Sequence, residues 1–252
     1  MCDKRKIRMK TNIIRLQTVD STNRYLHDCP PVGEEEMTVA VANYQTAGRG
    51  QGTNTWESEA GANLLFSLMV HPCWMPVGRQ FLLSMAGALA LKETLDAYID
   101  FVTLKWPNDV YWRDSKLSGT LIETTVNSRG IGRCIFGIGL NVNQREFRSD
   151  APNPVSLYQL LGREIDREHL LHEILHAFEH YYELLRQGRY GEVSQRYHEA
   201  LYRRSDFYRY RDKDGEFEGT IVEVEDDGHL ILRDREGSIR SYAFKEVEFV
   251  RS

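Results

Sequence analysis

Two short segments of the chain combine charged, amide and rigid side chains in a way that suits a ligand-binding site. The first, Lys105–Asp109, reads Lys-Trp-Pro-Asn-Asp, and the second, Lys116–Gly119, reads Lys-Leu-Ser-Gly. Lysines and a carboxylate in one short stretch can hold a charged ligand and move a proton, and the Trp-Pro step restricts the backbone between them. A strand end with solvated charges would show the same residues without any chemistry.

A glycine-rich loop, Gly48–Trp56, forms a second candidate cluster and reads Gly-Arg-Gly-Gln-Gly-Thr-Asn-Thr-Trp. Alternating glycines let a backbone approach a ligand closely and expose its amide donors, and Arg49 adds a permanent cation that suits phosphate or carboxylate. The loop lacks both the Rossmann spacing before a helix and the Gly-Lys-Ser/Thr ending of a Walker A loop. On its own it fits a flexible hairpin equally well.

A third cluster, Gly137–Asn143, places two glycines and two asparagines at a predicted strand. Glycine inside a strand indicates that another group approaches the backbone closely, and asparagine amides can recognise a ligand. A bulged strand end is an equal alternative for this segment.

The segment His172–His176 matches the H-E-x-x-H pattern of zinc proteases. Apolar residues of the same predicted helix, such as Leu171 and Ile174, define its buried face and leave the histidines largely on the other side. A catalytic zinc site needs its histidines in a cleft, with a third ligand. We therefore interpret the pattern as a solvated helix face and assign no metal-binding residue.

The composition is that of an ordinary globular protein. The 252 residues are 41% hydrophobic and 27% charged, and the formal net charge of −5 argues against a protein-wide nucleic-acid surface. The four cysteines form no C-x-x-C pair, and no apolar run reaches the roughly 18 residues of a membrane span. We therefore expect a reduced, cytoplasmic protein that does not enter a membrane.

Hydrophobic patterning predicts the elements that position these clusters. Predicted strands are Ile13–Leu16, Met37–Asn43, Asn63–Val70, Phe101–Trp106, Leu117–Val126 and Arg133–Asn141. Gln80–Tyr98 has the length and the Ala/Leu content of a buried helix, and helical periodicity covers Asp166–Arg204. The N-cap types of Asp20–Asn23 predict a short helix toward Cys29. These segments predict a sheet with flanking helices.

The pattern changes after Ser205. Short strand-like stretches follow at Phe207–Arg211, Glu218–Val224, Leu230–Leu232 and Ile239–Phe244, with Asp-Gly or Glu-Gly turn signals between them. This predicts two domains, residues 1–204 and 205–252, of which the second is a small β-barrel. In the alternative, the late strands extend the main sheet.

Five motifs follow one another in an order that resembles the biotin–protein ligases, also called biotin–[acetyl-CoA-carboxylase] ligases. They are Asp20–Asn23, Tyr44–Gly50, Lys105–Asp109, Lys116–Glu123 and Gly137–Asn141. Each motif is weak alone, whereas all five with family-like spacing are specific. The resemblance implies an α+β fold with a mixed, mostly antiparallel sheet and flanking helices, as in the class II synthetase-like biotin and lipoate ligases, and a small C-terminal SH3-like β-barrel.

The resemblance also implies a reaction in two steps. The carboxylate of biotin attacks the α-phosphorus of ATP, with Mg²⁺ required, and a lysine of a biotin carboxyl carrier domain then attacks biotinyl-5′-AMP. Carried over by motif, biotin would contact Ser21, Thr22, Asn23, Gln45, Arg49, Gly50, Gln51, Lys116 and Gly119. The nucleotide would contact Trp56, Lys105, Asn108 and Asn141, and the catalytic residues would be Lys116, Asp109 and Arg49.

The chemistry of adenylation asks for such groups. A carboxylate must approach a polyanion, so cations such as Arg49, Lys116 and Lys105 would have to neutralise both. The mixed anhydride hydrolyses in water, and we expect the loop Ala47–Ala60 to close over it. The acceptor amine must lose a proton, and we expect Asp109 to orient or accept from it.

The chain departs from the family pattern in its glycine loop. Many members carry Gly-Arg-Gly-Arg-Arg-Gly-Arg there, and Gln51, Gly52 and Asn54 replace three of those cations. Because a cation holds a desolvated anion better than a neutral donor does, we expect weaker retention of the adenylate than in arginine-rich members. Only about a dozen residues precede the first predicted strand, so we expect no helix-turn-helix domain and no binding to DNA.

Two other functions compete with this interpretation. A lipoate–protein ligase shares the fold and the adenylation chemistry, and the Lys-Trp-Pro-Asn-Asp motif favours biotin over it. A non-catalytic biotin-binding protein would have lost turnover, and the retained Arg49, Asp109 and Lys116 argue against that. An exposed edge strand would also allow two chains to pair as a homodimer.

Overall fold

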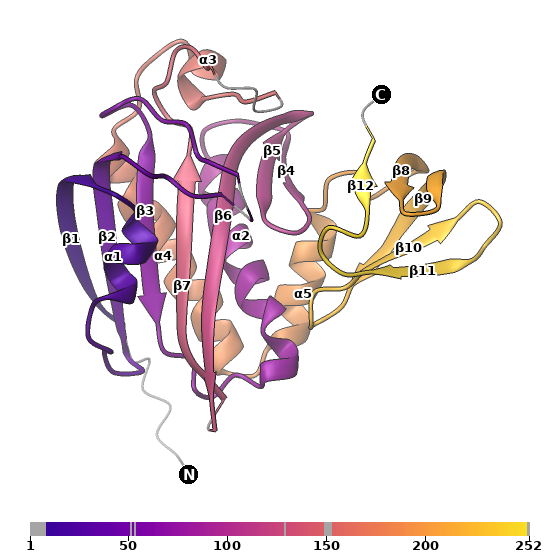
Figure 1. The fold of residues 1–252 in the computed structure, drawn as a ribbon, viewed down its shortest axis with the longest axis horizontal. Coiled ribbons are helices and arrows are strands. Elements are labelled where there is room, and N and C mark those ends of the chain that lie inside the picture. Colours follow the sequence, from indigo (N-terminus) through magenta and orange to yellow (C-terminus); the bar gives the residue numbers. More distant parts are fainter. Residues whose placement is uncertain (1–8, 51, 53, 129, 149–152, 251–252) are drawn as a thin grey trace.

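A seven-stranded mixed sheet forms the centre of the fold (Figure 1). The computed structural model describes residues 9–50, 52, 54–128, 130–148 and 153–250. In the order β1-β2-β3-β7-β6-β5-β4 the strands are β1 Lys10–Val19, β2 Glu36–Gln45, β3 Leu64–Val70, β7 Gly130–Leu140, β6 Ser115–Asn127, β5 Asp109–Trp112 and β4 Val102–Lys105. Only the edge pair β1 and β2 is parallel, which confirms the expected mixed, mostly antiparallel sheet.

Alternation along the central strands separates the two faces of this sheet. Residues such as Leu64 and Phe66 of β3 join the main apolar core with two long helices, α2 Phe81–Asp96 and α4 Arg167–Arg186. Met69, which points to the opposite face, packs instead against Leu26 of the short helix α1 Thr22–His27. The long helices therefore cover one face, whereas α1 covers only part of the other and leaves it accessible for a site (Figure 1).

The remaining helices are the 3₁₀ turn η1 Val77–Arg79, α3 Leu157–Leu161 and α5 Tyr190–Glu199. In α4 the apolar residues are buried, whereas His172 and His176 are exposed. His172 lies 3.3 Å from a carboxylate oxygen of Glu168 on the same helix. The H-E-x-x-H segment thus lies on a solvated helix face, as predicted.

The C-terminal residues form a separate five-stranded antiparallel sheet (Figure 1). Its strands, in the order β11-β10-β9-β8-β12, are β11 Ile239–Tyr242, β10 Leu230–Asp234, β9 Gly215–Val224, β8 Tyr208–Asp212 and β12 Glu248–Phe249. These strands do not extend the main sheet, so that alternative is wrong. Closure of this sheet into an SH3-like barrel and the domain boundary after residue 204 stay predictions.

Hydrogen bonds connect the C-terminal sheet to the rest of the chain. The indole Nε1 of Trp106 donates to the carbonyl of Gly228 at 2.9 Å, and the amide of Phe81 donates to the carbonyl of Asp226 at 3.1 Å. Because both acceptors belong to one turn between β9 and β10, this turn fixes the C-terminal sheet against the start of α2. Within the described residues, no helix is both long and apolar enough to cross a membrane.

Candidate functional site

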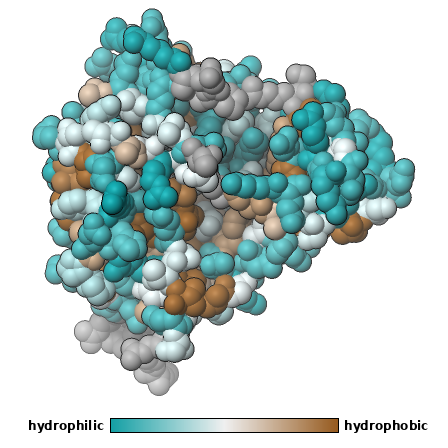
Figure 2. Space-filling view, in the orientation of Figure 1, coloured by the Kyte–Doolittle hydropathy of each residue, from teal (hydrophilic) through white to brown (hydrophobic). Residues whose placement is uncertain are grey.

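A cavity of about 640 Å³ lies between the accessible face of the main sheet and the C-terminal sheet. Figure 2 shows the molecule hollowed between these two parts. Most of the predicted site residues line this cavity: Ser21, Thr22, Asn23, Gln45, Arg49, Gly50, Trp56, Lys105, Asn108, Asp109, Lys116 and Gly119. The fold thus brings together clusters that lie far apart in the sequence.

Hydroxyl and amide groups around the start of α1 form one wall of the cavity. The side-chain oxygen of Gln45 accepts from both the backbone amide and the hydroxyl of Thr22, at 2.7 and 3.1 Å. The hydroxyl of Ser67 lies 2.7 Å from that of Thr22 and 2.6 Å from the amide oxygen of Asn23. Since Thr22, Asn23 and Ser67 are almost completely buried, their mutual hydrogen bonds fix the directions in which they present donors and acceptors.

Ser67 was not among the predicted site residues. It lies on β3 on the same face as Met69, and a single serine in an apolar strand carries no signal of its own in the sequence. Its role as a support for Thr22 and Asn23 becomes visible only when β3 and α1 are brought together.

Glycines on β6 and β7 let two side chains lie directly on the sheet. A Cβ atom at Gly137 would stand 2.2 Å from the Asn23 amide oxygen, and one at Gly139 would stand 2.3 Å from the Trp56 ring. A Cβ atom at Gly119 would also come within 3.2 Å of that ring. The close approach predicted for this glycine segment is confirmed, because any larger residue would displace Asn23 or Trp56.

Trp56 supplies an aromatic surface and an available donor at this platform. Its ring centroid lies 5.9 Å from the Lys116 ammonium, and its Nε1 is buried without a hydrogen-bond partner among the described residues. A buried indole N–H normally has a partner, so Trp56 is suited to donate to a bound ligand.

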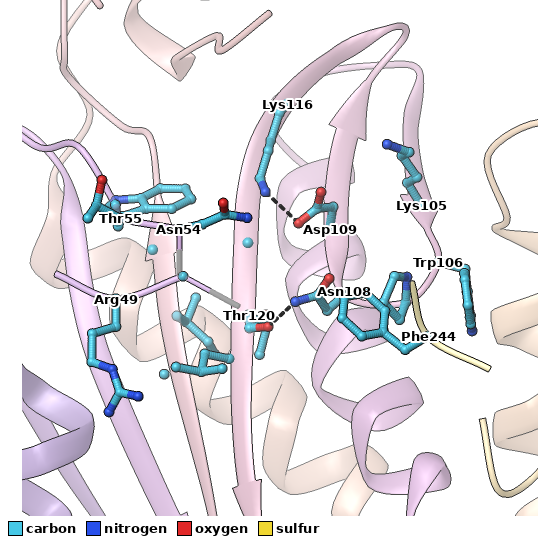
Figure 3. A pocket seen from close by; sticks show the side chains of 18 of the residues that line it. Arg49, Asn54, Thr55, Lys105, Trp106, Asn108, Asp109, Lys116, Thr120 and Phe244 are labelled. Atoms are coloured by element: carbon cyan, nitrogen blue, oxygen red, sulfur yellow. Dashed lines mark hydrogen bonds and ion pairs between the residues drawn. The ribbon is translucent and has the colours of Figure 1, made fainter. Parts of the chain in front are cut away.

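Lys116 and Asp109 form the closest ion pair of the cavity wall, with 2.7 Å between Nζ and Oδ1 (Figure 3). Adjacent strands hold them, since Asp109 begins β5 and Lys116 lies near the start of β6. A proton-accepting carboxylate therefore lies in contact with a cation, a combination that suits attack at an anionic centre.

Arg49 approaches the cavity from the glycine loop, and its side chain is 56% exposed. Its guanidinium lies 3.8 Å from the carboxylate of Glu123, which also accepts from the Asn23 amide at 2.8 Å. The loop ends pair as a hairpin, because Arg49 forms an isolated bridge with Thr55 and the Trp56 amide donates to the Gly48 carbonyl at 3.0 Å. The hairpin interpretation of this loop is thus confirmed, and Arg49 of the hairpin lines the cavity, whereas ligand binding by the loop stays a prediction.

Residues of the Lys105–Asp109 segment line the cavity and also bind neighbouring strands. The Lys105 ammonium lies 3.1 Å from the Tyr111 hydroxyl and 4.8 Å from the centre of its ring. The Asn108 amide donates to the Thr120 carbonyl at 2.5 Å, which ties the turn to β6 (Figure 3). The Trp106–Pro107 peptide bond is cis.

One predicted site residue among the described residues does not line the cavity. Asn141 is buried outside the cavity lining, and its amide donates to the Val155 carbonyl at 3.1 Å. Its neighbour Asn143 exchanges hydrogen bonds with the backbone of Ile165, each at 2.9 Å. The Nδ2 group of Asn141 and both amide groups of Asn143 therefore bind the chain's own backbone, whereas Oδ1 of Asn141 has no partner among the described residues. Gln51 lies outside the described residues.

The C-terminal sheet contributes lining residues that the sequence did not reveal. They are Phe244, Lys245, Val247, Glu248 and Phe249. The Phe244 ring lies 6.3 Å from the Trp106 ring, so the two domains predicted from the sequence meet at this wall (Figure 3). No short-range pattern could have indicated this, because more than a hundred residues separate the two walls in the sequence.

Comparison with known proteins gives a family assignment. The model of the biotin/lipoate A/B protein ligase family matches residues 15–143, just over half of the chain. The bifunctional ligase/repressor BirA of Bacillus subtilis is 29% identical over 241 residues, which cover 93% of this chain and 73% of BirA. The biotin–[acetyl-CoA-carboxylase] ligase of Mycobacterium tuberculosis is 34% identical over 145 residues, which cover 56% of this chain and 52% of that protein.

Solved structures give the same assignment. The biotin protein ligase from Aquifex aeolicus, in complex with biotin and ATP, superposes with a TM-score of 0.79 at 27% identity, over 96% of this chain and 99% of that one. The match includes the C-terminal part as well as the main sheet. The chain belongs to the biotin/lipoate A/B protein ligase family.

Proposed function

We propose that this protein is a biotin–protein ligase that forms biotinyl-5′-AMP from biotin and ATP and transfers biotin to a lysine of a biotin carboxyl carrier domain. The Lys116–Asp109 pair beside the Trp56 platform is the observation that carries this proposal. It places a cation, a proton acceptor and an aromatic surface in one cavity. The biotin ligases among the related proteins support biotin as the substrate.

The wall at α1 suits the cyclic urea of biotin. That group offers two N–H donors and a carbonyl acceptor, and Ser21, Thr22, Asn23 and Gln45 present hydroxyl and amide groups that can pair with both kinds. Because these residues are fixed by their own hydrogen bonds, the biotin ring would meet a preorganised surface. The proposed biotin contacts also include Arg49, Gly50, Gln51, Lys116 and Gly119.

Other residues of the cavity lining suit the nucleotide. Trp56 can stack on a base or donate from its indole, and Lys105 and Asn108 also line the cavity. When the biotin carboxylate attacks the α-phosphorus, the new bond forms between a carboxylate oxygen and phosphorus, and pyrophosphate leaves. Lys116 and Arg49 would stabilise the negative charge that gathers on the phosphoryl oxygens.

Magnesium fits this cavity as an ion that ATP brings with it. Asp109 and Glu248 are the carboxylates in the lining among the described residues. One or two carboxylates together with substrate phosphates are the usual protein environment of Mg²⁺ in nucleotide sites. We propose that Asp109 contributes to holding the ion.

In the second step the acceptor amine attacks the acyl carbon of the adenylate and AMP leaves. The amine must first lose a proton, and Asp109, a carboxylate of the cavity lining, would orient the amine or accept that proton. The acceptor domain, a cytoplasmic location, a homodimer and the absence of DNA binding stay predictions.

Thermal unfolding with different ligands tests the substrate. A ligand at 100 times its Kd stabilises a protein by about 2.7 kcal/mol, which raises Tm by several degrees. We expect biotin to raise Tm, biotin with MgATP to raise it further, and lipoate to have no effect. A shift with lipoate alone would identify a lipoate ligase. A shift with biotin but no gain from MgATP would favour a binding protein without turnover.

A further inference from the structure

Lys245 occupies an unusual position in the wall that the C-terminal sheet contributes. It lies in the turn between β11 and β12 and lines the cavity. Its φ of 72° is in the left-handed region, which lysine rarely adopts. Such backbone strain persists only where the surrounding structure imposes it, and it gathers at functional sites.

The side chain of Lys245 reaches across to the glycine loop. Its Nζ lies 2.7 Å from the point where a Cβ atom at Gly52 would stand. Gly52 itself has a φ of +68°, so a side chain at that position would be strained and would also meet the ammonium group. The ammonium group of Lys245 therefore lies beside the glycine loop at Gly52, where the loop has no side chain.

The charged groups around the cavity distinguish Lys245 from two other cations of the lining, Lys116 and Arg49. Lys116 is paired with Asp109 at 2.7 Å, and Arg49 lies 3.8 Å from Glu123. Lys245 has no ion pair among the described residues. Its ammonium group lies over the ring of Phe244, 5.7 Å from the ring centroid.

The two glutamates nearest to Lys245 in the sequence have other partners. Glu246 accepts from the Ala243 amide at 2.8 Å, and Glu248 lies 3.5 Å from the guanidinium of Arg211. A cation that lines a cavity without a carboxylate partner is available to an anion of the ligand. Polyphosphate is the most highly charged anion in the proposed reaction, and the compact ammonium of a lysine suits phosphate oxygens.

We propose that Lys245 is a nucleotide-binding residue that contacts the phosphates of ATP from the C-terminal sheet. This deepens the proposed function and rests on it. Lys245 places positive charge beside Gly52, in a loop where position 52 has no side chain and Asn54 is uncharged. Binding of the nucleotide would thereby depend on the docking of the C-terminal sheet.

Exchange of labelled pyrophosphate into ATP, with biotin present, tests this proposal on the full chain. In Lys245→Gly, which removes the ammonium and relieves the left-handed backbone, we expect the KM for MgATP to rise at least tenfold and the Kd for biotin to stay unchanged. Lys245→Arg should restore the KM to within about threefold of the unmodified protein. Lys213→Met, which removes an exposed lysine of the β8–β9 turn, is the matched control and should leave all constants unchanged.

Transfer of biotin from preformed biotinyl-5′-AMP to the acceptor domain provides the second measurement, because that compound lacks the pyrophosphate. We expect Lys245→Gly to leave this transfer rate unchanged. An unchanged KM for MgATP in Lys245→Gly would overturn the proposal, and so would a KM that rises only for the acceptor domain. No exchange in the unmodified protein would instead contradict the proposed function itself.

Discussion

At the scale of single residues, Lys116 and Asp109 determine what the cavity can do. Each group is partly shielded from solvent, with 29% and 17% of the side chain exposed, and each neutralises the other at 2.7 Å. In the proposed reaction, Lys116 would turn to the bound anion, and Asp109 would then be free to act on the incoming amine or on a metal ion. The proposal thus assigns this pair a part in both half-reactions.

Asp109→Asn tests whether Asp109 accepts a proton in the transfer step. The amide keeps the size of the side chain but cannot accept a proton from the acceptor lysine, so we expect transfer from preformed biotinyl-5′-AMP to slow about 100-fold, the usual size of a general-base effect. Asp96→Asn is the matched control, because Asp96 also pairs with a lysine at 2.7 Å, on the surface of α2. Transfer at the normal rate in Asp109→Asn would refute the assigned role.

At the scale of secondary structure, two glycines of β7 make room for two side chains of the proposed binding site. Gly137 leaves space for Asn23 and Gly139 leaves space for Trp56. The alternation of the strand sends Gly137 and Gly139 to the same face, two residues apart, so the two proposed binding regions lie side by side.

Alanine substitutions at these glycines should weaken different ligands. In Gly137→Ala the new methyl group displaces Asn23, so we expect biotin to bind at least tenfold more weakly. In Gly139→Ala it displaces Trp56, so we expect the larger loss for MgATP. Isothermal titration with each ligand measures both, and Gly191→Ala, where a Cβ atom meets nothing within 4 Å, is the control. Equal losses of both ligands in both variants would contradict the separate roles.

The sequence predicted this scaffold well where strands are apolar and helices long. The predicted strand Asn63–Val70 differs from β3 by one residue, and Gln80–Tyr98 encloses α2. It missed β5, and it missed α3 because a five-residue helix shows too few periods. Ser156 and Gln159 nevertheless form a capping box that marks the start of α3. The first strand is longer than Ile13–Leu16, since its ends are polar edge positions.

For the site, local motifs predicted most residues of one wall and none of the other. Lys105, Asp109 and Lys116 carry their signal within a few neighbouring positions. Phe244 and Lys245 carry none, because they reach the cavity only after the turn at Gly228 docks on Trp106. Asn141 was predicted as a site residue but lies outside the cavity lining. An asparagine whose amide binds backbone cannot be distinguished in a sequence from one that binds a ligand.

At the scale of the whole molecule, the fold also buries a titratable group away from the cavity. His71 follows β3, is 6% exposed, and neither of its ring nitrogens has a partner among the described residues. Burial lowers the pKa of His71, and the positive charge of Arg133 lowers it further. Below about pH 6.5 the imidazole of His71 therefore binds a proton more readily in the unfolded chain than in the folded protein.

The free energy of unfolding should consequently fall as the pH drops below about 6.5, by at most about 1.4 kcal/mol per pH unit from this single group. In His71→Leu this part of the decrease should disappear, whereas in His176→Gln, which changes an exposed histidine of α4, it should remain. Urea unfolding at pH 7.5 and 5.5 measures the difference. A decrease of the same size in His71→Leu and in the unmodified protein would show that His71 does not contribute.

The central claim is that this cavity attaches biotin to another protein, and the intact mass of the acceptor measures it most directly. The purified protein is incubated with biotin, MgATP and a biotin carboxyl carrier domain. We predict that the acceptor gains the mass of one biotinyl group, and that Lys116→Ala abolishes this gain while the protein still unfolds cooperatively. An acceptor of unchanged mass after incubation with the unmodified protein, or full modification by Lys116→Ala, would contradict the claim.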